Sequence, residues 1–291
     1  MSEQPIIDTA LVRRLVDARF PEWAGLPLRR LTPAGSDHVI HRLGDELAVR
    51  LPRHPGAIGQ AAKEAEWLPR LAPHLPLTVP APVAVGEPAF GYPWPWAVTR
   101  WLDGTVATVD TLADSHETAA KLAEFLLALQ DATPDGAQPD GAELAGEKLA
   151  ARDRATRAAI AETSAVFEAG AMTACWEAAL AAPGWARPPV WFHGDFHTGN
   201  LLTRDGGLSA VIDFGNLGVG DPACDLMIAF TLMTPETRAT FRAALGCDDA
   251  TWARGRGWAL ATGLTAYIFY AATDPRVAAQ TTRQITAALT G

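Results

Sequence analysis

Residues 190–213 constrain the fold of this chain more than any other stretch, because a short strand, a polar loop and a tight hairpin follow one another there. The apolar strand end Val190–Phe192 leads into the loop His193–Asn200. A second strand begins at Leu201, the turn Asp205–Gly207 reverses the chain, and residues 208–213 return antiparallel. The hairpin is therefore expected to bring Asp213 back beside Asn200, thirteen positions earlier.

The residue types in this stretch suit phosphoryl transfer from a nucleotide. Asp195 follows the strand end, so its carboxylate would be held at the edge of a sheet, where it can orient an acceptor hydroxyl and take its proton. Asn200 and Asp213 add an amide oxygen and a carboxylate, hard donors of the kind that Mg²⁺ prefers. Each residue alone would also suit an ordinary turn, but the three at this spacing favour a metal-dependent site.

The motif His193-Gly194-Asp195 with Asn200, followed by Ile212-Asp213-Phe214-Gly215, resembles the aminoglycoside phosphotransferase family, which is similar in fold to the eukaryotic protein kinases. The strong match covers about residues 190–230, and a weaker one extends back to residue 31. The resemblance implies an α+β, two-lobed protein-kinase-like fold. Residues 1–101 would form a small antiparallel-sheet N-lobe that binds nucleotide, and residues 102–291 a larger, mostly helical C-lobe with the catalytic loop and the acceptor-binding helices.

The same resemblance implies roles for individual residues of the C-lobe. Asp195 would be the catalytic residue, Asn200 and Asp213 the ligands of Mg²⁺, and His193 and Asp225 supports of the catalytic loop. Alternatively, His193 and His197, at positions i and i+4, could bind a metal ion together. The loop explains both histidines without a metal, because His193 would pack the loop and His197 would lie at the surface or on the acceptor side.

In the N-lobe the family places a cation on the third strand to hold the nucleotide phosphates, and a helical glutamate to fix that cation. The corresponding residues are Arg50, where most of the family has lysine, and Glu64. Arginine can bind phosphate through two N–H groups. Alternatively, Arg50 could be an exposed charge at the end of a strand, and Glu64 could lie on a solvated helix face. Lys63 or Arg53 could also share the binding of the nucleotide phosphates with Arg50.

Two further N-lobe segments would contact the nucleotide. Ser36 lies where the phosphate-covering loop is expected, although the sequence there is not a GxGxxG motif. Residues 99–102, with Thr99 and Trp101, would form the hinge between the lobes, whose backbone groups would bind the adenine edge.

Local patterns predict the remaining elements. Helices are expected at 8–20, 58–71, 116–130, 151–182 with a break near Gly170, 235–245, 250–272 and 275–289. Strands are expected within 31–42, at 46–51, as an edge strand at 78–85 in a proline-rich stretch, and at 96–102. Residues 133–146 are expected to be a weakly structured connection.

The composition of the chain narrows the classes of molecule that it can bind. The 291 residues carry a formal net charge of −9, which argues against nucleic-acid binding. The acidic charge fits a cationic partner, although many enzymes are acidic without one. No apolar run reaches the roughly 18 residues of a membrane span, no signal peptide is evident, and the three cysteines show no disulfide or zinc spacing. A cytoplasmic protein that is a monomer or weak dimer is expected.

The family resemblance implies a small-molecule kinase that uses ATP, or GTP, with Mg²⁺ to phosphorylate a hydroxyl of an antibiotic. An aminoglycoside is the first candidate acceptor, because acidic side chains of the C-lobe could bind a polycation: Asp153, Glu162, Glu168 and Glu177. A macrolide, a peptide antibiotic or a small metabolite alcohol is the alternative, and a macrolide would need an apolar cleft that Trp176, Trp185, Phe230 and Trp258 could line. A second alternative is a non-catalytic nucleotide-binding pseudokinase, which the Arg50 departure favours slightly.

Overall fold

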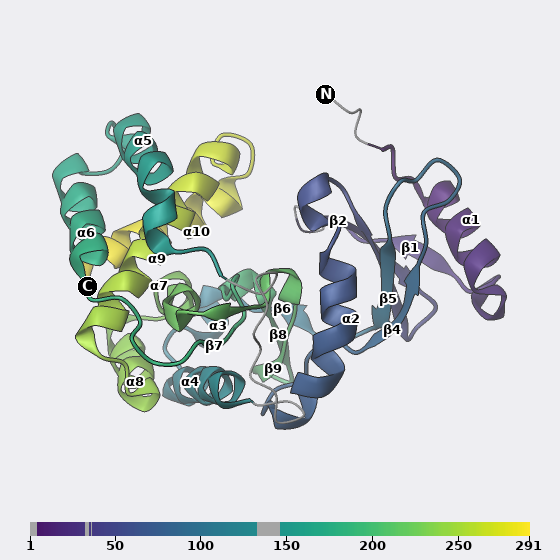
Figure 1. Cartoon of the computed structure of the whole chain (residues 1–291), viewed down its shortest axis with the longest axis horizontal. Coiled ribbons are helices and arrows are strands. Elements are labelled where there is room, and N and C mark those ends of the chain that lie inside the picture. Colours follow the sequence, from purple (N-terminus) through teal and green to yellow (C-terminus); the bar gives the residue numbers. More distant parts are fainter. Residues whose placement is uncertain (1–4, 33–34, 36, 133–145) are drawn as a thin grey trace. The chain divides into compact units, whose positions relative to one another are not determined.

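The computed structural model describes residues 5–32, 35, 37–132 and 146–291, and the chain divides into two compact units (Figure 1). Unit 1 comprises Met1–Pro73, Thr78–Gly104 and Ala210–Asn216. Unit 2 comprises His74–Leu77, Thr105–Ser209 and Leu217–Gly291. The short segment that contains Asp213 thus belongs to unit 1, although it is remote from the rest of that unit in sequence. The lobe boundary at residues 101 and 102 stays a prediction.

Unit 1 is built on a five-stranded antiparallel sheet with the order β1-β2-β3-β5-β4. Its strands are β1 (Leu28–Arg30), β2 (His38–Leu43), β3 (Leu47–Pro52), β4 (Pro82–Gly86) and β5 (Trp96–Arg100). The central strand β3 is buried at every position. The edge strand expected at 78–85 starts only at Pro82, since proline lacks the N–H that a ladder needs and is confined to sheet edges.

Helices α1 (Thr9–Arg19) and α2 (Gln60–Leu71) lie on opposite sides of this sheet (Figure 1). Helix α1 begins where the Asp8 carboxylate accepts a hydrogen bond from the Leu11 N–H, as an N-cap does. Its apolar face packs into the main core of unit 1, where Phe20 meets Trp96 edge to face at 5.6 Å.

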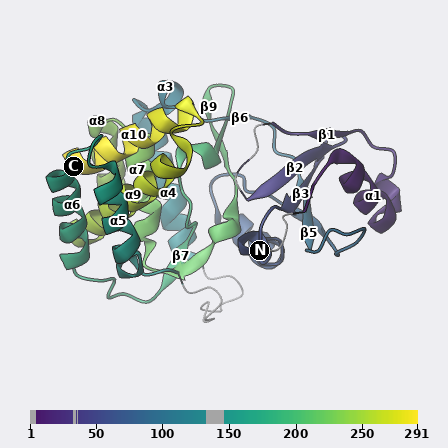
Figure 2. The same ribbon diagram turned by 90° about the horizontal axis from the view of Figure 1, so that it is seen from above.

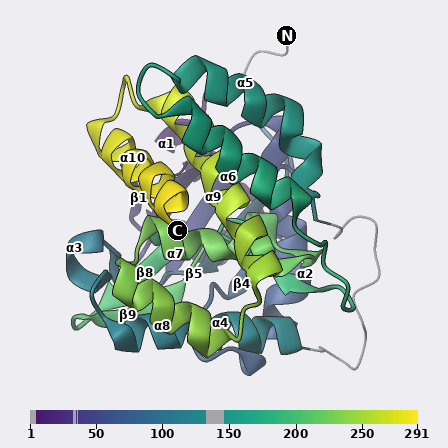
Figure 3. The same cartoon turned by 90° about the vertical axis from the view of Figure 1, so that its left-hand side faces the viewer.

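Unit 2 is mostly helical. Its helices are α3 (Val109–Leu112), α4 (His116–Asp131), α5 (Asp153–Thr163), α6 (Ala169–Ala181), α7 (Met227–Thr231), α8 (Pro235–Leu245), α9 (Asp249–Tyr270) and α10 (Pro275–Thr290). Figure 2 shows α5 and α6 beside α9 and α10, and Figure 3 shows the same group from the side. Gly257 allows the close approach of α9 to α6, because a Cβ there would lie 2.5 Å from the Ala179 methyl.

Unit 2 also contains two small sheets, one of which includes the strand that leads into Ala210–Asn216. One has the order β6-β8-β9 and the other pairs β10 with β7. Their strands are β6 (Thr105–Val106), β7 (Val190–Phe192), β8 (Leu201–Arg204), β9 (Gly207–Val211) and β10 (Gly218–Gly220). The predicted hairpin after Asn200 is therefore present as β8 and β9.

The sequence predicted this architecture with few errors. The α+β class, with a small antiparallel sheet and a larger helical part, is confirmed, and α8 spans the expected residues. The helical stretch predicted at 151–182, with a break near Gly170, is present as two helices, because α5 ends at Thr163 and α6 begins at Ala169. The Glu168 carboxylate caps α6 by accepting from the Gly170 and Ala171 N–H groups.

Two other expectations concern the rest of the chain. The connection predicted at 133–146 lies, apart from Gly146, outside the described residues. Within the described part of the chain, no helix is both long and apolar enough to cross a membrane.

Replacing Gly86 by alanine tests the packing of unit 1. A Cβ at Gly86 would lie 2.0 Å from the ring of the fully buried Trp96, so Gly86→Ala is expected to lower the free energy of unfolding by about 2 kcal/mol. Urea titration measures the effect. Gly59→Ala is the control, since it has open space around it and a φ of −78°. Equal stability of the two variants would contradict the close packing of β4 on Trp96.

Candidate active site

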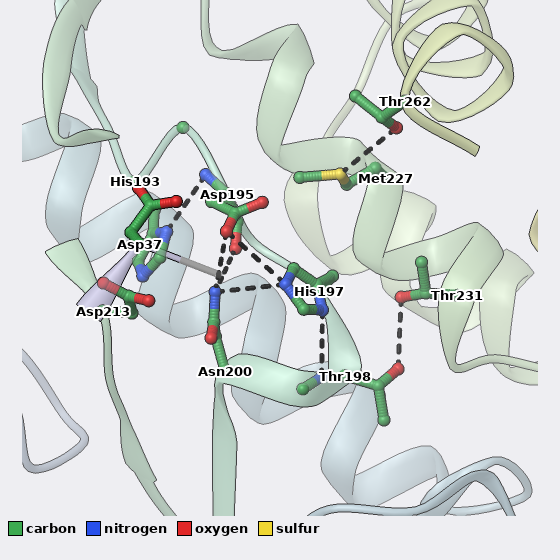
Figure 4. A network of polar contacts seen from close by, with 12 residues as sticks. Asp37, His193, Asp195, His197, Thr198, Asn200, Asp213, Met227, Thr231 and Thr262 are labelled. Atoms are coloured by element: carbon green, nitrogen blue, oxygen red, sulfur yellow. Dashed lines mark hydrogen bonds and ion pairs between the residues drawn. The ribbon is translucent and has the colours of Figure 1, made fainter. Parts of the chain in front are cut away.

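The polar loop after β7 holds Asp195 and Asn200 together (Figure 4). The Asp195 side chain is 40% exposed, and Asn200 is buried. The Asn200 Nδ2 donates to the Asp195 backbone oxygen at 2.9 Å and to Asp195 Oδ2 at 3.1 Å. Because the amide nitrogen is used in this way, Asn200 Oδ1 is the polar atom of that side chain left for a ligand.

His197 also contacts the Asp195 carboxylate, which the sequence interpretation missed by placing this histidine at the surface or on the acceptor side. His197 Nδ1 accepts from the Gly199 N–H at 3.0 Å, so Nε2 carries the proton. This Nε2 lies 3.5 Å from Asp195 Oδ2. The Asp-x-His spacing was the available signal, because the His197 N–H donates to the Asp195 backbone oxygen at 3.1 Å and this tight turn brings the two side chains close together.

These neighbours keep Asp195 ionised. Burial alone would raise the pKa of Asp195, but the hydrogen bond and charge of His197, the charge of His193 and the Asn200 hydrogen bond outweigh it, so the pKa lies below its usual value. A carboxylate of low pKa orients a hydroxyl group well but is a weak base.

The buried carboxylate of Asp225 holds the start of the catalytic loop in place. Its carboxylate is 1% exposed and accepts from the His193 N–H at 2.7 Å and from the Gly194 N–H at 2.8 Å. Burial raises the pKa of Asp225 to about 7, although the two backbone hydrogen bonds oppose the rise. His193 is fully buried and accepts the Asp195 N–H on Nδ1 at 3.2 Å.

An aromatic stack anchors the middle of the loop. Phe196 is fully buried and stacks on Phe125 of α4, with ring centroids 5.6 Å apart and an interplanar angle of 6°. The backbone of the loop is therefore held at both His193 and Phe196, and Asp195 lies between these two anchors.

Unit 1 contains a second polar cluster, centred on Arg50 in β3. Arg50 Nη1 lies 2.5 Å from Glu64 Oε2, and Nη2 lies 2.9 Å from Asp213 Oδ1. Arg50 is 8% and Glu64 2% exposed, so neither is the solvated surface charge that the alternative reading allowed. Arg53, which could have shared the role, donates its Nε to the His38 backbone oxygen instead.

The charges in this cluster depend on one another. Burial raises the pKa of Glu64, and Arg50 opposes the rise. Burial would lower the pKa of Arg50, but Glu64 and Asp213 raise it above its usual value. An arginine suits this position because its planar fork reaches two carboxylates at once, which a single ammonium group does less well.

The backbone at Asp213 is strained. Its φ of 65° lies in the left-handed region, which a non-glycine residue adopts only where its surroundings impose it. The next turn packs closely on the start of α2, since a Cβ at Gly215 would lie 2.4 Å from the Gln60 side chain. Gln60 Nε2 in turn donates to Asp37 Oδ2 at 2.9 Å. Ser36, the expected phosphate contact, lies outside the described residues.

The expected hinge has fewer available backbone groups than the sequence suggested. Thr99 is 3% exposed. The Trp101 N–H donates to the Glu46 oxygen at 2.7 Å, which leaves only the carbonyl of Trp101 for a ligand. The Leu102 N–H donates no hydrogen bond within the described part of the chain, so it is the hinge donor that a nucleotide could use.

Comparison with protein families identifies the class of enzyme. A model described as the phosphotransferase enzyme family, APH, matches residues 29–258, and the chain belongs to this family. The predicted family and the predicted phosphotransferase activity are thereby confirmed. No curated protein sequence matches the chain significantly.

Solved structures share the fold over nearly the whole chain. The GDP and kanamycin complex of APH(2″)-IIia covers 96% of this chain and 98% of its own, with a TM-score of 0.74 and 17% identity. The streptomycin–ATP–APH(2″)-IIa ternary complex covers 98% and 99%, with a TM-score of 0.62 and 16% identity. The macrolide 2′-phosphotransferase MphH from Brachybacterium faecium covers 96% and 97%, with a TM-score of 0.61 and 25% identity.

Removing the Arg50 guanidinium tests the cluster in unit 1. Arg50→Ala leaves Glu64 buried without its partner and should lower the free energy of unfolding by about 3–5 kcal/mol. Arg50→Lys should fall between this variant and the wild type. Arg204→Ala is the control, because Arg204 is 67% exposed and should contribute less than about 1 kcal/mol. Urea unfolding of the four proteins distinguishes them, and equal losses for the two alanine variants would refute the buried ion pair.

The pH dependence of stability tests Asp225. A carboxyl group whose pKa is raised to about 7 on folding contributes stability below its usual pKa of 3.8 and loses that contribution as the pH rises through 7. Asp225→Asn removes the titration, so the stability advantage of the wild type over the variant should shrink between pH 5 and pH 8. Urea unfolding of both proteins at each pH measures this difference. A difference that is constant with pH would be inconsistent with the raised pKa.

Proposed function

We propose that the protein transfers the γ-phosphoryl group of ATP, or GTP, to a hydroxyl of an antibiotic. The observation that carries this proposal is the ionised, 40% exposed Asp195 carboxylate, held by Asn200 and His197 on a rigid loop. A group so placed can receive a hydroxyl proton while its position changes little. Support also comes from the solved relatives, whose complexes contain ATP with streptomycin or GDP with kanamycin.

In the proposed reaction the acceptor oxygen bonds to the γ-phosphorus as the bond from that phosphorus to the β-bridging oxygen breaks. The hydroxyl proton passes to the Asp195 carboxylate, and ADP leaves with the bridging oxygen. The transition state is loose, so positioning and charge neutralisation contribute more than proton removal. The low pKa of Asp195 agrees with an orienting role.

Asn200 and Asp213 are the residues we propose to hold Mg²⁺, which would neutralise phosphate charge when bound. Their donor atoms fit the ion. Asn200 offers Oδ1 because Nδ2 is engaged with Asp195. Asp213 accepts Arg50 on Oδ1, and Oδ2 has no hydrogen-bond donor among the described residues. Among the described residues, no three or more His, Cys, Asp or Glu side chains gather as a ready metal site.

Arg50 and Glu64 are proposed to hold the nucleotide phosphates, with Arg50 as the contact and Glu64 as its support. The arginine at position 50, where most of the family has lysine, was the argument for a pseudokinase. Arg50 nevertheless pairs with Glu64 as the expected lysine would, so the departure gives little support to that alternative. A phosphate would compete with Asp213 for Nη2 of Arg50.

The structure weakens the charge argument for an aminoglycoside acceptor. Asp153 accepts hydrogen bonds from the Trp176 indole and from Arg157, and Glu177 pairs with Arg157. Glu168 caps α6. Three of the four acidic side chains considered for a polycation thus already have partners within the protein. Aminoglycosides, macrolides, peptide antibiotics and small alcohols all remain candidates, and the cytoplasmic location and the monomeric or weakly dimeric state stay predictions.

Replacing Asp195 tests the reaction. Asp195→Asn should lower kcat for the best acceptor by about a thousandfold, because the amide lacks the negative charge that orients the hydroxyl group and cannot take its proton. Nucleotide affinity should stay within about threefold, since the substitution adds no bulk and removes no proposed nucleotide contact. ADP release is measured with ATP and with GTP, in the presence of kanamycin, erythromycin or small alcohols.

Asp205→Asn is the matched control, because Asp205 lies in an exposed turn with a φ of 53°, which asparagine also tolerates. Full activity of Asp195→Asn would refute the catalytic assignment. An absence of acceptor-dependent ADP release from the wild type with every acceptor would favour the pseudokinase.

A further inference from the structure

The side chain of Gln60, at the start of α2, is a buried amide beside the charged cluster of unit 1. Gln60 is 7% exposed, and its Nε2 donates to Asp37 Oδ2 at 2.9 Å. Its Oε1 is buried and accepts no hydrogen bond among the described residues. A buried amide oxygen without a donor lowers stability, a cost that a methionine of similar length would avoid. This cost points to a role for the Gln60 amide that an apolar side chain could not fill.

The Gln60 amide packs directly on the backbone of Gly215. A Cβ at Gly215 would lie 2.4 Å from both Cδ and Oε1 of Gln60, so no larger residue fits there without a shift. The φ of Gly215 lies outside the left-handed region, and its missing side chain therefore provides space rather than conformational freedom. Gly215 comes two residues after Asp213. Gln60 thus supports the turn that follows the proposed metal ligand.

Asp37, the hydrogen-bond partner of Gln60, is itself held by the chain that leads from β3 to α2. Its Oδ1 lies 3.3 Å from His54 Nε2, and its backbone oxygen accepts the Arg53 N–H at 2.8 Å. Asp37 directly precedes β2. The Gln60 amide therefore joins the entry to β2 with the turn after Asp213, two segments of unit 1 that are far apart in sequence.

Helix α2 holds Asp213 and Gly215 through two contacts, one ionic and one neutral. Glu64 lies one turn after Gln60 and pairs with Arg50. Arg50 in turn pairs with Asp213. Residues at i and i+4 share one face of a helix, so both contacts start from the same side of α2. A nucleotide phosphate on Nη2 of Arg50 would displace Asp213 from the ionic contact, whereas the packing of Gln60 on Gly215 involves no charge and would persist.

We propose that Gln60 is a positioning residue for phosphoryl transfer, which keeps the Asp213 segment on α2 when a nucleotide phosphate takes Arg50 from Asp213. The hydrogen bond to Asp37 fixes the orientation of the Gln60 amide, and the amide supports Gly215. Gln60 acts through Asp213 and needs no contact with substrate. This inference rests on the proposed roles of Arg50 and Asp213. It implies that the effect of Mg²⁺ on nucleotide binding depends on a neutral side chain of α2.

Three variants separate the two contacts of Gln60. Gln60→Met keeps the packing volume and removes the hydrogen bond to Asp37, and Gln60→Ala removes both contacts. Glu66→Ala is the control, because Glu66 is an exposed residue of the same helix. The Kd of ADP, or of GDP if it binds more tightly, is measured calorimetrically with excess Mg²⁺ and with EDTA. The ratio of the two constants is the readout.

We expect Mg²⁺ to tighten nucleotide binding about tenfold less in Gln60→Ala than in the wild type, because Asp213 is no longer held once a phosphate takes Arg50. Gln60→Met should reduce the Mg²⁺ effect about threefold, since the packing on Gly215 persists while the hydrogen bond is lost. Glu66→Ala should leave it unchanged. The Mg²⁺ concentration for half-maximal ADP release should rise in the same order, while kcat at saturating Mg²⁺ changes little.

A double-mutant cycle tests the packing contact itself. Gly215→Ala adds a Cβ that overlaps Gln60, so it should weaken the Mg²⁺ effect at least as much as Gln60→Ala does. In the double variant the new methyl occupies the space that the amide leaves, and the Mg²⁺ effect should recover to within about threefold of the wild type. Urea unfolding of the same four proteins without nucleotide should show the same non-additive pattern.

Two results would overturn the inference. One is a Mg²⁺ effect within about twofold of the wild type in both Gln60 variants, since a merely structural residue would change only the unfolding midpoint. The other is strict additivity of Gln60→Ala and Gly215→Ala. Gln60→Met provides the test if Gln60→Ala does not fold.

Failure of the proposed metal site has a different signature. If Asp213→Asn also leaves the Mg²⁺ effect intact, Asp213 does not hold the ion, and the role of Gln60 is rejected together with it. Loss of the effect in Asp213→Asn, with both Gln60 variants unchanged, would reject the role of Gln60 alone.

Discussion

The buried guanidinium of Arg50 is the interaction on which the organisation of unit 1 depends. A charge that is 8% exposed needs charged partners, and Arg50 has two, Glu64 on α2 and Asp213. Asp213 is 163 residues away in sequence, so this pairing helps to bring Ala210–Asn216 into the same compact unit as the sheet. The left-handed backbone of Asp213 is held where its carboxylate reaches Arg50. One side chain thereby links the central strand, the helix and the motif segment.

Unit 2 holds its catalytic loop through hydrogen bonds to a buried carboxyl group and through aromatic packing. The Asp225 carboxylate satisfies two backbone N–H groups of the catalytic loop, and Phe196 stacks on Phe125. Both anchors are buried, whereas the Asp195 carboxylate between them is 40% exposed. A reactive group on a rigid support loses little conformational freedom when a substrate binds, which is the advantage that positioning gives to phosphoryl transfer.

The distribution of charge in the helical unit bears on the acceptor. The net charge of −9 suggested a cationic substrate, but a total charge says little about which carboxylates are free. Asp153, Glu168 and Glu177 stabilise helices or pair with arginine. The total charge is therefore a poor guide to the acceptor, because the partners of the individual carboxylates decide which of them can bind a ligand.

The sequence by itself determined the element order, the hairpin after Asn200 and the family, because periodicity, turn residues and motif spacing are local properties. Other features depended on residues far apart in sequence, and only the tertiary structure decided them. The pairing of Arg50 with both Glu64 and Asp213 is the main example. Of the four aromatic residues considered for a macrolide cleft, Trp185 and Trp258 line a cavity within unit 2, while Trp176 and Phe230 are fully buried. Burial and partner choice follow from packing between distant elements, and no local pattern encodes them.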